Sequence, residues 1–317
     1  MLCTSPLKGI RAGDGSVTLI KGEKSEAQAE KRVSSAGGAY LQLLIPCRAC
    51  LACRINKSRD WVIRSVHEAS LWQHNCFITL TYSPEHMPPG AGLKHEDFQL
   101  FMKRLRVTAE RKFGFKDIRY LMCGEYGKTT LRPHYHAILF NLDFPDKQPI
   151  GRGGGGHMRY ESPMLRELWA LGHTEVGTAS EESMGYVARY TFKKAAEFDN
   201  IVDKTRLATI DLQTGEYHAR KPEYVRSSRR PGIGTSWLER FHEDCWKGYV
   251  THNEVKYRLP LFYKEWLATH FPERYDAISP TWVEKAEDLP QMPWDRRQDI
   301  AEFNRITLNQ SKSRTEL

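Results

Sequence analysis

The segment at 124–140, GEYGKTTLRPHYHAILF, holds the residue types from which a metal site is built. In a β-strand, residues i and i+2 point to the same face, so His134 and His136 would place two imidazoles side by side. Glu125 ends the preceding apolar run, and antiparallel pairing across the connection at 126–133 would bring its carboxylate beside both rings. Such a ligand set suits Mg²⁺ or Mn²⁺ acting as a Lewis acid on a phosphodiester. The alternative is an ordinary pair of surface or core histidines.

The same segment contains GKTT, which is typical of the end of a phosphate-binding loop. That loop needs G-x-x-x-x-G-K-[ST] between a strand and a helix, so that backbone N–H groups cradle the phosphates. Here Met122 stands where the first glycine belongs, and a proline-interrupted strand follows Lys128. The sequence therefore favours the histidines as the seat of the chemistry.

A second candidate group lies in YVARYTFKK, 186–194. Tyr186 and Tyr190 are four positions apart on a predicted helix and share a face, and Lys193 and Lys194 follow on about the same side. A phenol with a pKa of about 10 is a poor nucleophile at neutral pH, but a nearby metal or ammonium group favours its phenolate. The alternative is a pair of half-buried tyrosines that cap a core.

The cysteines of CRACLACR indicate a second metal site. Cys47, Cys50 and Cys53 have the spacing C-x-x-C-x-x-C, which would hold Zn²⁺ in a tight turn, and we expect Cys3 as the fourth ligand because the N-terminal arm is long enough to return. The alternative is three reduced thiols at the start of a helix. Without a secretory leader, a disulfide framework is not expected. The remaining cysteines lie in apolar contexts and are expected to be buried: Cys76, Cys123 and Cys245.

Composition favours an anionic partner, because 47 Lys and Arg against 39 Asp and Glu give a net charge of +8 and a pI near 9.0. Basic residues crowd three stretches: Arg48, Arg54, Lys57, Arg59 and Arg64; Lys103, Arg104, Arg106, Arg111 and Lys112; and Arg220, Lys221, Arg226, Arg229 and Arg230. Interleaved aromatic residues fit single-stranded nucleic acid, which needs phosphate neutralisation and stacking together. The alternative is a set of solvated helix faces. We expect a soluble cytoplasmic protein, since no apolar run is long enough to cross a bilayer.

The elements that must position these residues follow the order β-α-β-β-α-β-α over 76–197. This order predicts an α+β fold with a ferredoxin-like antiparallel sheet, the split βαβ arrangement, and an added helix. The strand CFITLTY at 76–82 precedes a helix that ends on Gly114, and a helix opened by Ser180 carries the tyrosines. The glycine-rich stretch at 151–157 is expected to form an exposed lobe.

The flanking regions complete a division into three parts. Residues 1–75 would contain a flexible arm or extended loop at 5–38, the zinc turn, and a basic helix from about Ile55 to Trp72. Residues 76–200 would form the catalytic domain. Residues 201–317 would form a smaller, mainly helical C-terminal appendage, with a hairpin around 214–215, helices near 236–250 and 260–270, and disorder over the last dozen residues.

Three segments in this order, FITLTY, GEYGKTTLRPHYHAILF and YVARYTFKK, resemble the motifs of HUH endonucleases. The wording is most similar to rolling-circle replication initiation proteins of microviruses, especially the gokushovirus group, and the resemblance spans roughly 40–235, including SRRPGIG. It implies the HUH endonuclease fold and a metal-dependent nickase that cuts one strand of phage origin DNA, keeps the 5′ phosphate on a tyrosine, and leaves a 3′ hydroxyl. It also implies site roles: His134 and His136 as metal ligands, Glu125 as the third, Tyr186 and Tyr190 as paired nucleophiles, and Lys193 or Lys194 as the motif lysine.

The resemblance also implies the reaction cycle and its partners. One tyrosine would hold the first DNA end while the other cuts the regenerated origin, and the 3′ hydroxyl would then close a circle without ATP. Single-stranded and origin DNA would be the partners in the bacterial host cytoplasm, with a host polymerase for extension and a host helicase because we find no helicase region. No membrane partner is expected. The rivals are a catalytically inactive DNA-binding protein on the same fold and a metal-dependent nuclease that uses water.

Overall fold

The computed structural model describes residues 3–11, 17–20, 41–127, 130–153, 156–197, 208–210 and 215–287, and for some of these, including 190–197, only the backbone. The described chain forms two compact units, one that includes residues up to Asn56 and one that begins at Lys57.

The first unit contains a three-stranded antiparallel sheet in the order β2-β1-β3, made of β1 (Leu7–Arg11), β2 (Val17–Ile20) and β3 (Leu41–Ile45). The expectation that 5–38 forms a flexible arm or loop is therefore wrong for β1 and β2. Ile10 is fully buried, and Gly9 allows close packing, because an added Cβ would lie 2.7 Å from the Ile45 side chain. The other residues of 5–38 lie outside the described ranges.

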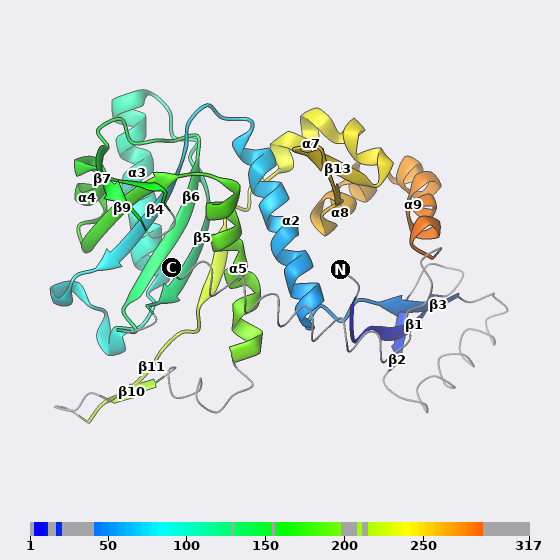
Figure 1. Cartoon of the computed structure of the whole chain (residues 1–317), viewed down its shortest axis with the longest axis horizontal. Coiled ribbons are helices and arrows are strands. Elements are labelled where there is room, and N and C mark those ends of the chain that lie inside the picture. Colours follow the sequence, from blue (N-terminus) through cyan, green and yellow to red (C-terminus); the bar gives the residue numbers. More distant parts are fainter. Residues whose placement is uncertain are drawn as a thin grey trace. The chain divides into compact units, whose positions relative to one another are not determined.

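The second unit is built on a seven-stranded sheet in the order β12-β5-β6-β4-β9-β8-β7, in which the pairings are antiparallel (Figure 1). The strands are β4 (Asn75–Tyr82), β5 (Arg119–Tyr126), β6 (Pro133–Phe140), β7 (Gln148–Arg152), β8 (Met158–Glu161), β9 (Gly172–Thr178) and β12 (Tyr224–Ser227).

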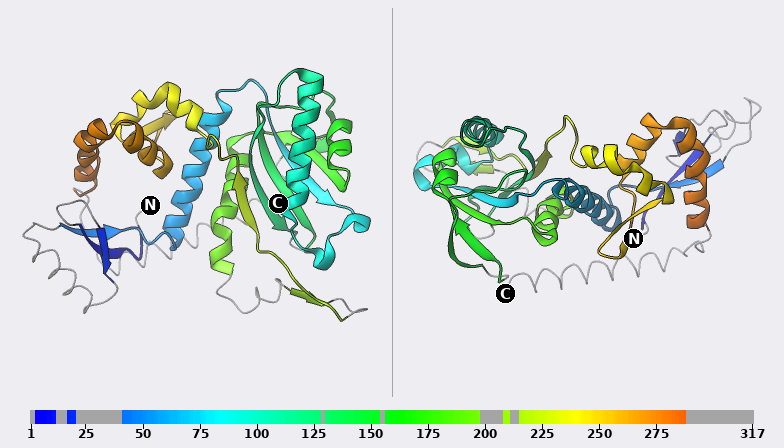
Figure 2. Two further views of the ribbon diagram at one scale, coloured as in Figure 1. Left: turned by 180° about the vertical axis from the view of Figure 1, so that it is seen from behind. Right: turned by 90° about the horizontal axis from the view of Figure 1, so that it is seen from above.

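Helices cover both faces of this sheet (Figure 2). On one face lie α3 (His95–Phe113) and α4 (Pro163–Trp169), and a cluster of apolar side chains from α3, α4 and the strands fills the space between them. On the other face, α5 (Glu181–Glu197) and α2 (Leu51–Ala69) pack against a second cluster that includes Leu121, Cys123 and Ile138. The short 3₁₀ helices η1 (Pro84–His86) and η2 (Pro89–Ala91) connect β4 to α3.

The predicted order of elements over 76–197 is confirmed, and so is the α+β class. Gly114 ends α3 in the left-handed region, with φ of 78°, and its N–H donates to the carbonyl of Glu110. The glycine-rich stretch joins β7 to β8, so it belongs to a hairpin that extends the sheet. The basic helix begins at Leu51, earlier than expected, because the cysteine turn leads directly into it.

Residues after 200 contribute to the sheet and also form a separate cluster. β12 pairs with β5, so the three-part division stays a prediction. The predicted hairpin around 214–215 is present as β10 (Ala208–Ile210) and β11 (Tyr217–Ala219). Further elements are α7 (Thr235–Phe241), η3 (His242–Lys247), β13 (Tyr249–His252), β14 (Val255–Arg258), α8 (Leu261–His270) and α9 (Pro272–Glu287). The helix expected at 236–250 thus ends earlier and gives way to a hairpin that we did not predict.

The appendage packs its own aromatic-rich cluster against Ile63 of α2. The last dozen residues, for which we expected disorder, lie outside the described ranges. Among the described residues, no helix combines the length and the apolar composition that a membrane span requires.

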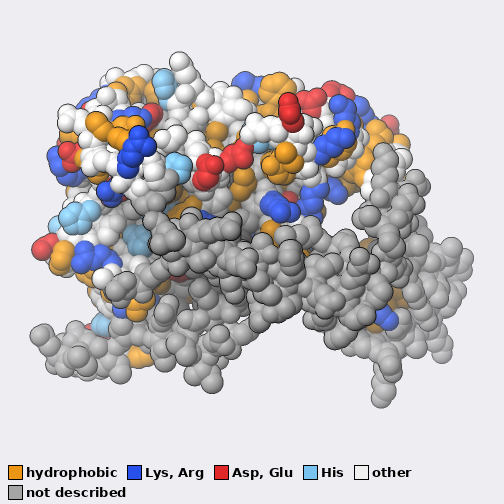
Figure 3. Space-filling view, in the orientation of Figure 1, with side chains coloured by type: hydrophobic (Ala, Val, Ile, Leu, Met, Phe, Trp, Pro, Cys, Tyr) orange, Lys and Arg blue, Asp and Glu red, His pale blue; other side chains and the backbone are white. Residues whose placement is uncertain are grey.

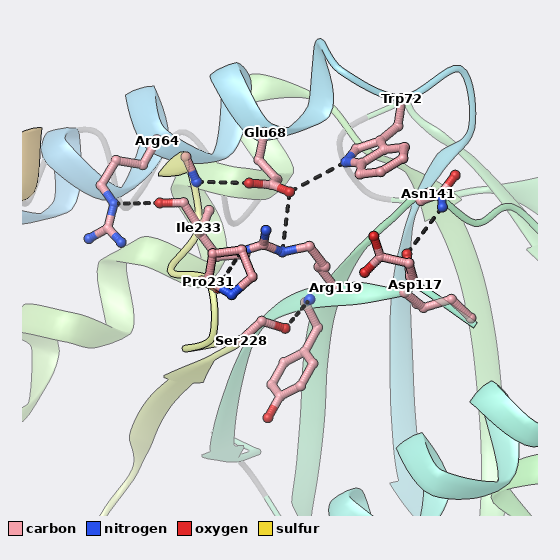
Figure 4. A network of polar contacts seen from close by, with 12 residues as sticks. Arg64, Glu68, Trp72, Asp117, Arg119, Asn141, Ser228, Pro231 and Ile233 are labelled. Atoms are coloured by element: carbon pink, nitrogen blue, oxygen red, sulfur yellow. Dashed lines mark hydrogen bonds and ion pairs between the residues drawn. The ribbon is translucent and has the colours of Figure 1, made fainter. Parts of the chain in front are cut away.

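A buried ion pair ties α2 to the sheet and to the loop after β12 (Figure 4). Glu68 is fully buried, and its Oε1 lies 3.3 Å from Arg119 Nε on β5. The N–H of Gly234 donates to Glu68 Oε2 at 2.8 Å, and Arg119 Nη2 donates to the carbonyl of Pro231 at 2.6 Å. These bonds fix the loop at 228–234 in place.

Candidate active site

The pairing of β5 with β6 brings three predicted ligands together. Glu125 lies directly opposite His134, and Cys123 lies opposite His136, so both histidines point to the face on which Glu125 lies. Nε2 of His134 lies 2.5 Å from Glu125 Oε1, and Nε2 of His136 lies 2.8 Å from the same oxygen. One carboxylate oxygen therefore receives both imidazoles.

The two histidines differ in charge because their second nitrogens meet different partners. His134 Nδ1 lies 3.0 Å from the carbonyl of Arg132, which can only accept, so both of its nitrogens carry protons. Burial opposes this charge, but the Glu125 hydrogen bond outweighs burial and raises the pKa of His134. His136 Nδ1 lies 3.0 Å from Thr79 Oγ1, a hydroxyl that can donate, and burial lowers the pKa of His136.

Glu125 itself is ionised. Its residue is only 4% exposed, and burial alone would raise the pKa of its carboxyl, but the hydrogen bonds from both histidines hold that pKa well below its usual range. Among the described residues, its second oxygen, Oε2, is buried without a hydrogen-bond partner. A buried acceptor of this kind costs about 1–3 kcal/mol unless something satisfies it.

Tyr186 completes the group from α5. Its hydroxyl donates to Glu125 Oε1 at 2.8 Å, and its ring meets the ring of His136 edge-on with centroids 5.0 Å apart. Burial and then the Glu125 charge raise the pKa of Tyr186, so the phenol is protonated in this arrangement. Reciprocal hydrogen bonds between Ser180 and Ser183 begin the helix, as expected from the sequence.

The other predicted residues of α5 are placed by backbone alone. Tyr190 follows Tyr186 by four positions and therefore shares its side of the helix, with Lys193 and Lys194 further along. Their side chains lie outside the described ones, so their roles stay predictions.

The donor set fits a divalent cation. One atom each from Glu125, His134 and His136 can be chosen so that all lie within 4.8 Å of one another. A carboxylate and two imidazoles are ligands of Mn²⁺ and related ions, and the bare Oε2 provides a further donor.

The cysteines also come together. Cys3, Cys47, Cys50 and Cys53 have their sulfurs within 4.8 Å of one another, and Cys3 Sγ lies 3.5 Å from Cys47 Sγ and 3.7 Å from Cys50 Sγ. Backbone N–H groups of Cys47 and Cys50 donate to Sγ of Cys3 and Cys47 at 3.3 and 3.2 Å. The other cysteines are buried, as expected: Cys76, Cys123 and Cys245.

Comparison with known proteins follows this geometry. A family model for replication-associated proteins of the ORF2 type matches residues 75–195. The replication-associated protein VP4 of Bdellovibrio phage phiMH2K is 34% identical over 265 residues, which cover 81% of this chain and 79% of that protein. The chain belongs to the phage replication-associated proteins.

Two further members of this family show how the similarity is distributed. The replication-associated protein ORF2 of Spiroplasma virus 4 is 37% identical over 208 residues, 64% of this chain and 59% of that protein. The replication-associated protein ORF4 of Chlamydia phage 1 is 34% identical over 229 residues, 70% of this chain and 53% of that protein. No solved structure matches the chain. The family match over 75–195 includes the strands and the helix that carry Glu125, His134, His136 and Tyr186.

Sequence reasoning on this replication-associated chain missed Thr79 and Phe77. Both lie on β4, where Thr79 is opposite His136 in register. The Phe77 ring stacks on the His136 ring at 5.4 Å and 7°. The alternation in FITLTY was the signal, because it places Phe77 and Thr79 on one face of the strand next to the histidines.

Proposed function

We propose that the chain is a replication initiator that cuts single-stranded or unwound phage origin DNA by tyrosine attack and later rejoins it. The observation that carries this proposal is the 2.8 Å contact between the Tyr186 hydroxyl and the Glu125 oxygen that both imidazoles also touch. A nucleophile, a carboxylate and two imidazoles meet at one point, from β5, β6 and α5.

The topology supports assignment to the HUH endonuclease fold. The central strands follow the order β5-β6-β4-β9, with α3 and α4 on one face, which is the arrangement of a ferredoxin-like split βαβ unit. Glu125 and the histidines lie on the opposite face, where α5 packs. We therefore assign the sheet a scaffold role and α5 the delivery of the nucleophile.

Glu125, His134 and His136 would hold Mg²⁺ or Mn²⁺, which supplies Lewis-acid polarisation of the phosphodiester. The carbonyl of Arg132 and the hydroxyl of Thr79 fix the ring orientations by binding the Nδ1 atoms. His134 must release its Nε2 proton when it becomes a ligand, so cation binding is favoured as pH rises. Glu125, once a ligand, would no longer repel the Tyr186 phenolate.

In the cut, the Tyr186 Oη–phosphorus bond forms and the phosphorus–O3′ bond breaks. The phenol proton, held on Glu125 Oε1 in this structure, ends on the departing 3′ oxygen. The reverse displacement by a 3′ hydroxyl restores the phosphodiester and frees the tyrosine, so joining needs no ATP. We assign Tyr190 the role of second nucleophile and Lys193 or Lys194 contact with a phosphate, while unwinding and extension in the bacterial host cytoplasm belong to a host helicase and polymerase.

The four clustered cysteines would hold a structural Zn²⁺. A tetrahedral site with Zn–S bonds of about 2.3 Å has sulfur–sulfur edges of about 3.8 Å. The separations of 3.5 and 3.7 Å from Cys3 match this geometry. Such an ion would link the segment before β1 to the start of α2. Purified protein should contain one zinc per chain by mass spectrometry of metals, and Cys50→Ser should lose it, whereas a Cys245→Ser control should keep it.

The experiment for the main proposal uses supercoiled replicative-form DNA of the phage that encodes the chain. With Mn²⁺ or Mg²⁺ the wild type should nick this DNA and form a covalent adduct that survives detergent and disappears after nuclease digestion. Tyr186→Phe should lose the adduct in the first round. An absent adduct in the wild type supports a DNA-binding protein without activity, and equal nicking by a Tyr186→Phe, Tyr190→Phe double variant supports a nuclease that uses water.

A further inference from the structure

A basic pocket lies beside the candidate active site and is not explained by it. Its cavity of about 330 Å³ is lined by Trp61 and Arg64 from α2, Phe262 from α8, and residues 225–229 and 232. Of the described residues that line it, none is acidic. In Figure 3, the Lys and Arg side chains visible on the described surface occur in separate places among acidic and apolar ones. The pocket therefore gives a more specific indication of a binding site than the overall charge.

Arg64 is the centre of the pocket. Its guanidinium carbon lies 4.1 Å from the centroid of the Trp61 ring and 4.0 Å from that of Phe262. Nε donates to the carbonyl of Ile233 at 3.0 Å, and Figure 4 shows the other two nitrogens pointing away from that carbonyl. Among the described residues, these terminal nitrogens make no hydrogen bond. They keep a positive charge at neutral pH, because burial lowers the pKa of Arg64 only to about 10.

The acidic residues near Arg64 are already engaged. Asp60 lies one turn before it on α2 and binds Arg258 at 3.1 Å, and Glu68 lies one turn after it and pairs with Arg119. Arg226 and Arg229 add two exposed guanidinium groups from the other wall. The pocket thus carries a local excess of positive charge.

The walls are rigid. The loop at 228–234 is held by three hydrogen bonds from different elements: Arg64 to Ile233, Arg119 to Pro231, and Gly234 to Glu68 (Figure 4). A preformed site loses little conformational entropy when it binds a ligand. The volume is at the lower end of the range for small-ligand pockets, which suits one nucleotide and is too small for a duplex.

The pocket and Tyr186 share one face of the sheet. Trp61, Val225 and Tyr186 all pack against the same hydrophobic cluster. Val225 lies opposite Cys123, which precedes Glu125 by two residues on β5. Two residues of a strand span about 7 Å, so a DNA strand that reaches Glu125 has its neighbouring nucleotides next to this wall.

We propose that this pocket binds one nucleotide of the strand that is cut, within a few positions of the scissile phosphate. Arg64, Arg226 and Arg229 contact the phosphate, and the base packs against the aromatic and guanidinium surfaces. The inference rests on the proposed function, since it names how the same substrate is held. A free mononucleotide has the same chemistry, and the experiment separates the two sources.

The test measures anisotropy of a fluorescein-labelled oligothymidylate on the Tyr186→Phe protein without added Mg²⁺ or Mn²⁺. Arg226→Ala with Arg229→Ala should weaken binding about 25-fold at 0.1 M salt and reduce the salt slope by about 1.4, because each phosphate contact on a single strand contributes about 0.7. The matched control, Arg111→Ala with Lys112→Ala, removes the same charge from exposed positions near the end of α3 and should change affinity less than about twofold. Equal effects of the two pairs would overturn the proposal.

Two further measurements locate the contact. An oligonucleotide carrying one iododeoxyuridine should photocrosslink to the peptide with Trp61 or Phe262 only from one or two adjacent positions, and Arg64→Lys, which keeps the charge but loses the planar stack, should abolish this preference. A flat crosslinking profile contradicts the proposal. So does displacement of the oligonucleotide by thymidine monophosphate at equal affinity, which identifies a mononucleotide site.

The outcomes also distinguish this inference from the proposed function. Pocket-dependent binding without any covalent adduct removes the proposed cleavage and keeps the pocket. An adduct formed by the wild type, together with unchanged oligonucleotide affinity in the Arg226→Ala, Arg229→Ala protein, removes the pocket and keeps the cleavage. Thermal unfolding of each variant verifies that the fold is intact.

Discussion

His67 should make the stability of the second unit depend on pH. The residue is only 6% exposed, its ring stacks on Trp237 at 3.7 Å and 14°, and its Nδ1 lies 2.9 Å from the Tyr263 hydroxyl. Burial, with a smaller effect of positive charge on His252, lowers the pKa of His67 to about 4. In the unfolded chain the same imidazole has a pKa of about 6.5.

The direction and size follow from these two values. Above about pH 6.5 the ring is neutral in both states and contributes no pH dependence. As pH falls from about 6.5 towards 4, the unfolded chain takes up the proton first, so the free energy of unfolding decreases; below about 4 the decrease ends. The full loss is about 3 kcal/mol, of which about 2.5 kcal/mol is reached at pH 4.5.

Urea unfolding followed by circular dichroism at a series of pH values between 7.5 and 4.5 measures this loss. His67→Phe keeps a ring on Trp237 but cannot titrate, so its stability should fall by about 2.5 kcal/mol less than that of the wild type over this range. His86→Gln, at an exposed histidine of η1, should keep the wild-type pH dependence. If His67→Phe loses as much stability as the wild type, burial of a neutral His67 is not the cause and the reasoning fails.

Three further predictions concern the site and its supports. Thr79→Val removes the partner of His136 Nδ1 and should weaken Mn²⁺ binding at least about tenfold by calorimetric titration, whereas Thr79→Ser should stay near wild type; equal affinities would exclude the orienting role. Arg119→Met leaves the Glu68 carboxylate buried without its cation and should cost about 3–5 kcal/mol in urea unfolding, while Arg119→Met with Glu68→Gln should cost less than the sum of the single changes; additive costs would show no coupling. Gly172→Ala should lower stability by more than about 3 kcal/mol, because its Cβ would lie 2.3 Å from backbone atoms of β4 and the next residue, whereas Gly114→Ala, with no atom within 4 Å, should cost about 1 kcal/mol; similar thermal shifts would contradict this account.

The central elements were predictable because each has a strong local pattern. CFITLTY is rich in β-branched and aromatic residues, and Phe98, Phe101 and Leu105 recur at helical spacing before Gly114. Pairing of Glu125 with His134 also followed from the sequence, since consecutive strands joined by a short connection are antiparallel neighbours.

Other elements depend on contacts that local patterns do not contain. β12 is four residues long, and its partner β5 lies about a hundred positions earlier. β1 and β2 have few apolar residues, and Ile10 alone among them is fully buried. The approach of Tyr186 to Glu125 depends on how Met184 and Val187 seat α5 on the sheet, which a helical pattern does not specify.

The position of β12 at the border of the main sheet determines how the chain can be shortened. A fragment that stops after α5 keeps the ligands and Tyr186 but strips the outer side of β5, leaving the backbone groups of residues 121–124 without the strand that pairs with them. It also removes Pro231 and Gly234, the polar partners of Arg119 and Glu68. Such a piece is expected to aggregate during expression, so the smallest usable fragment must continue beyond Gly234.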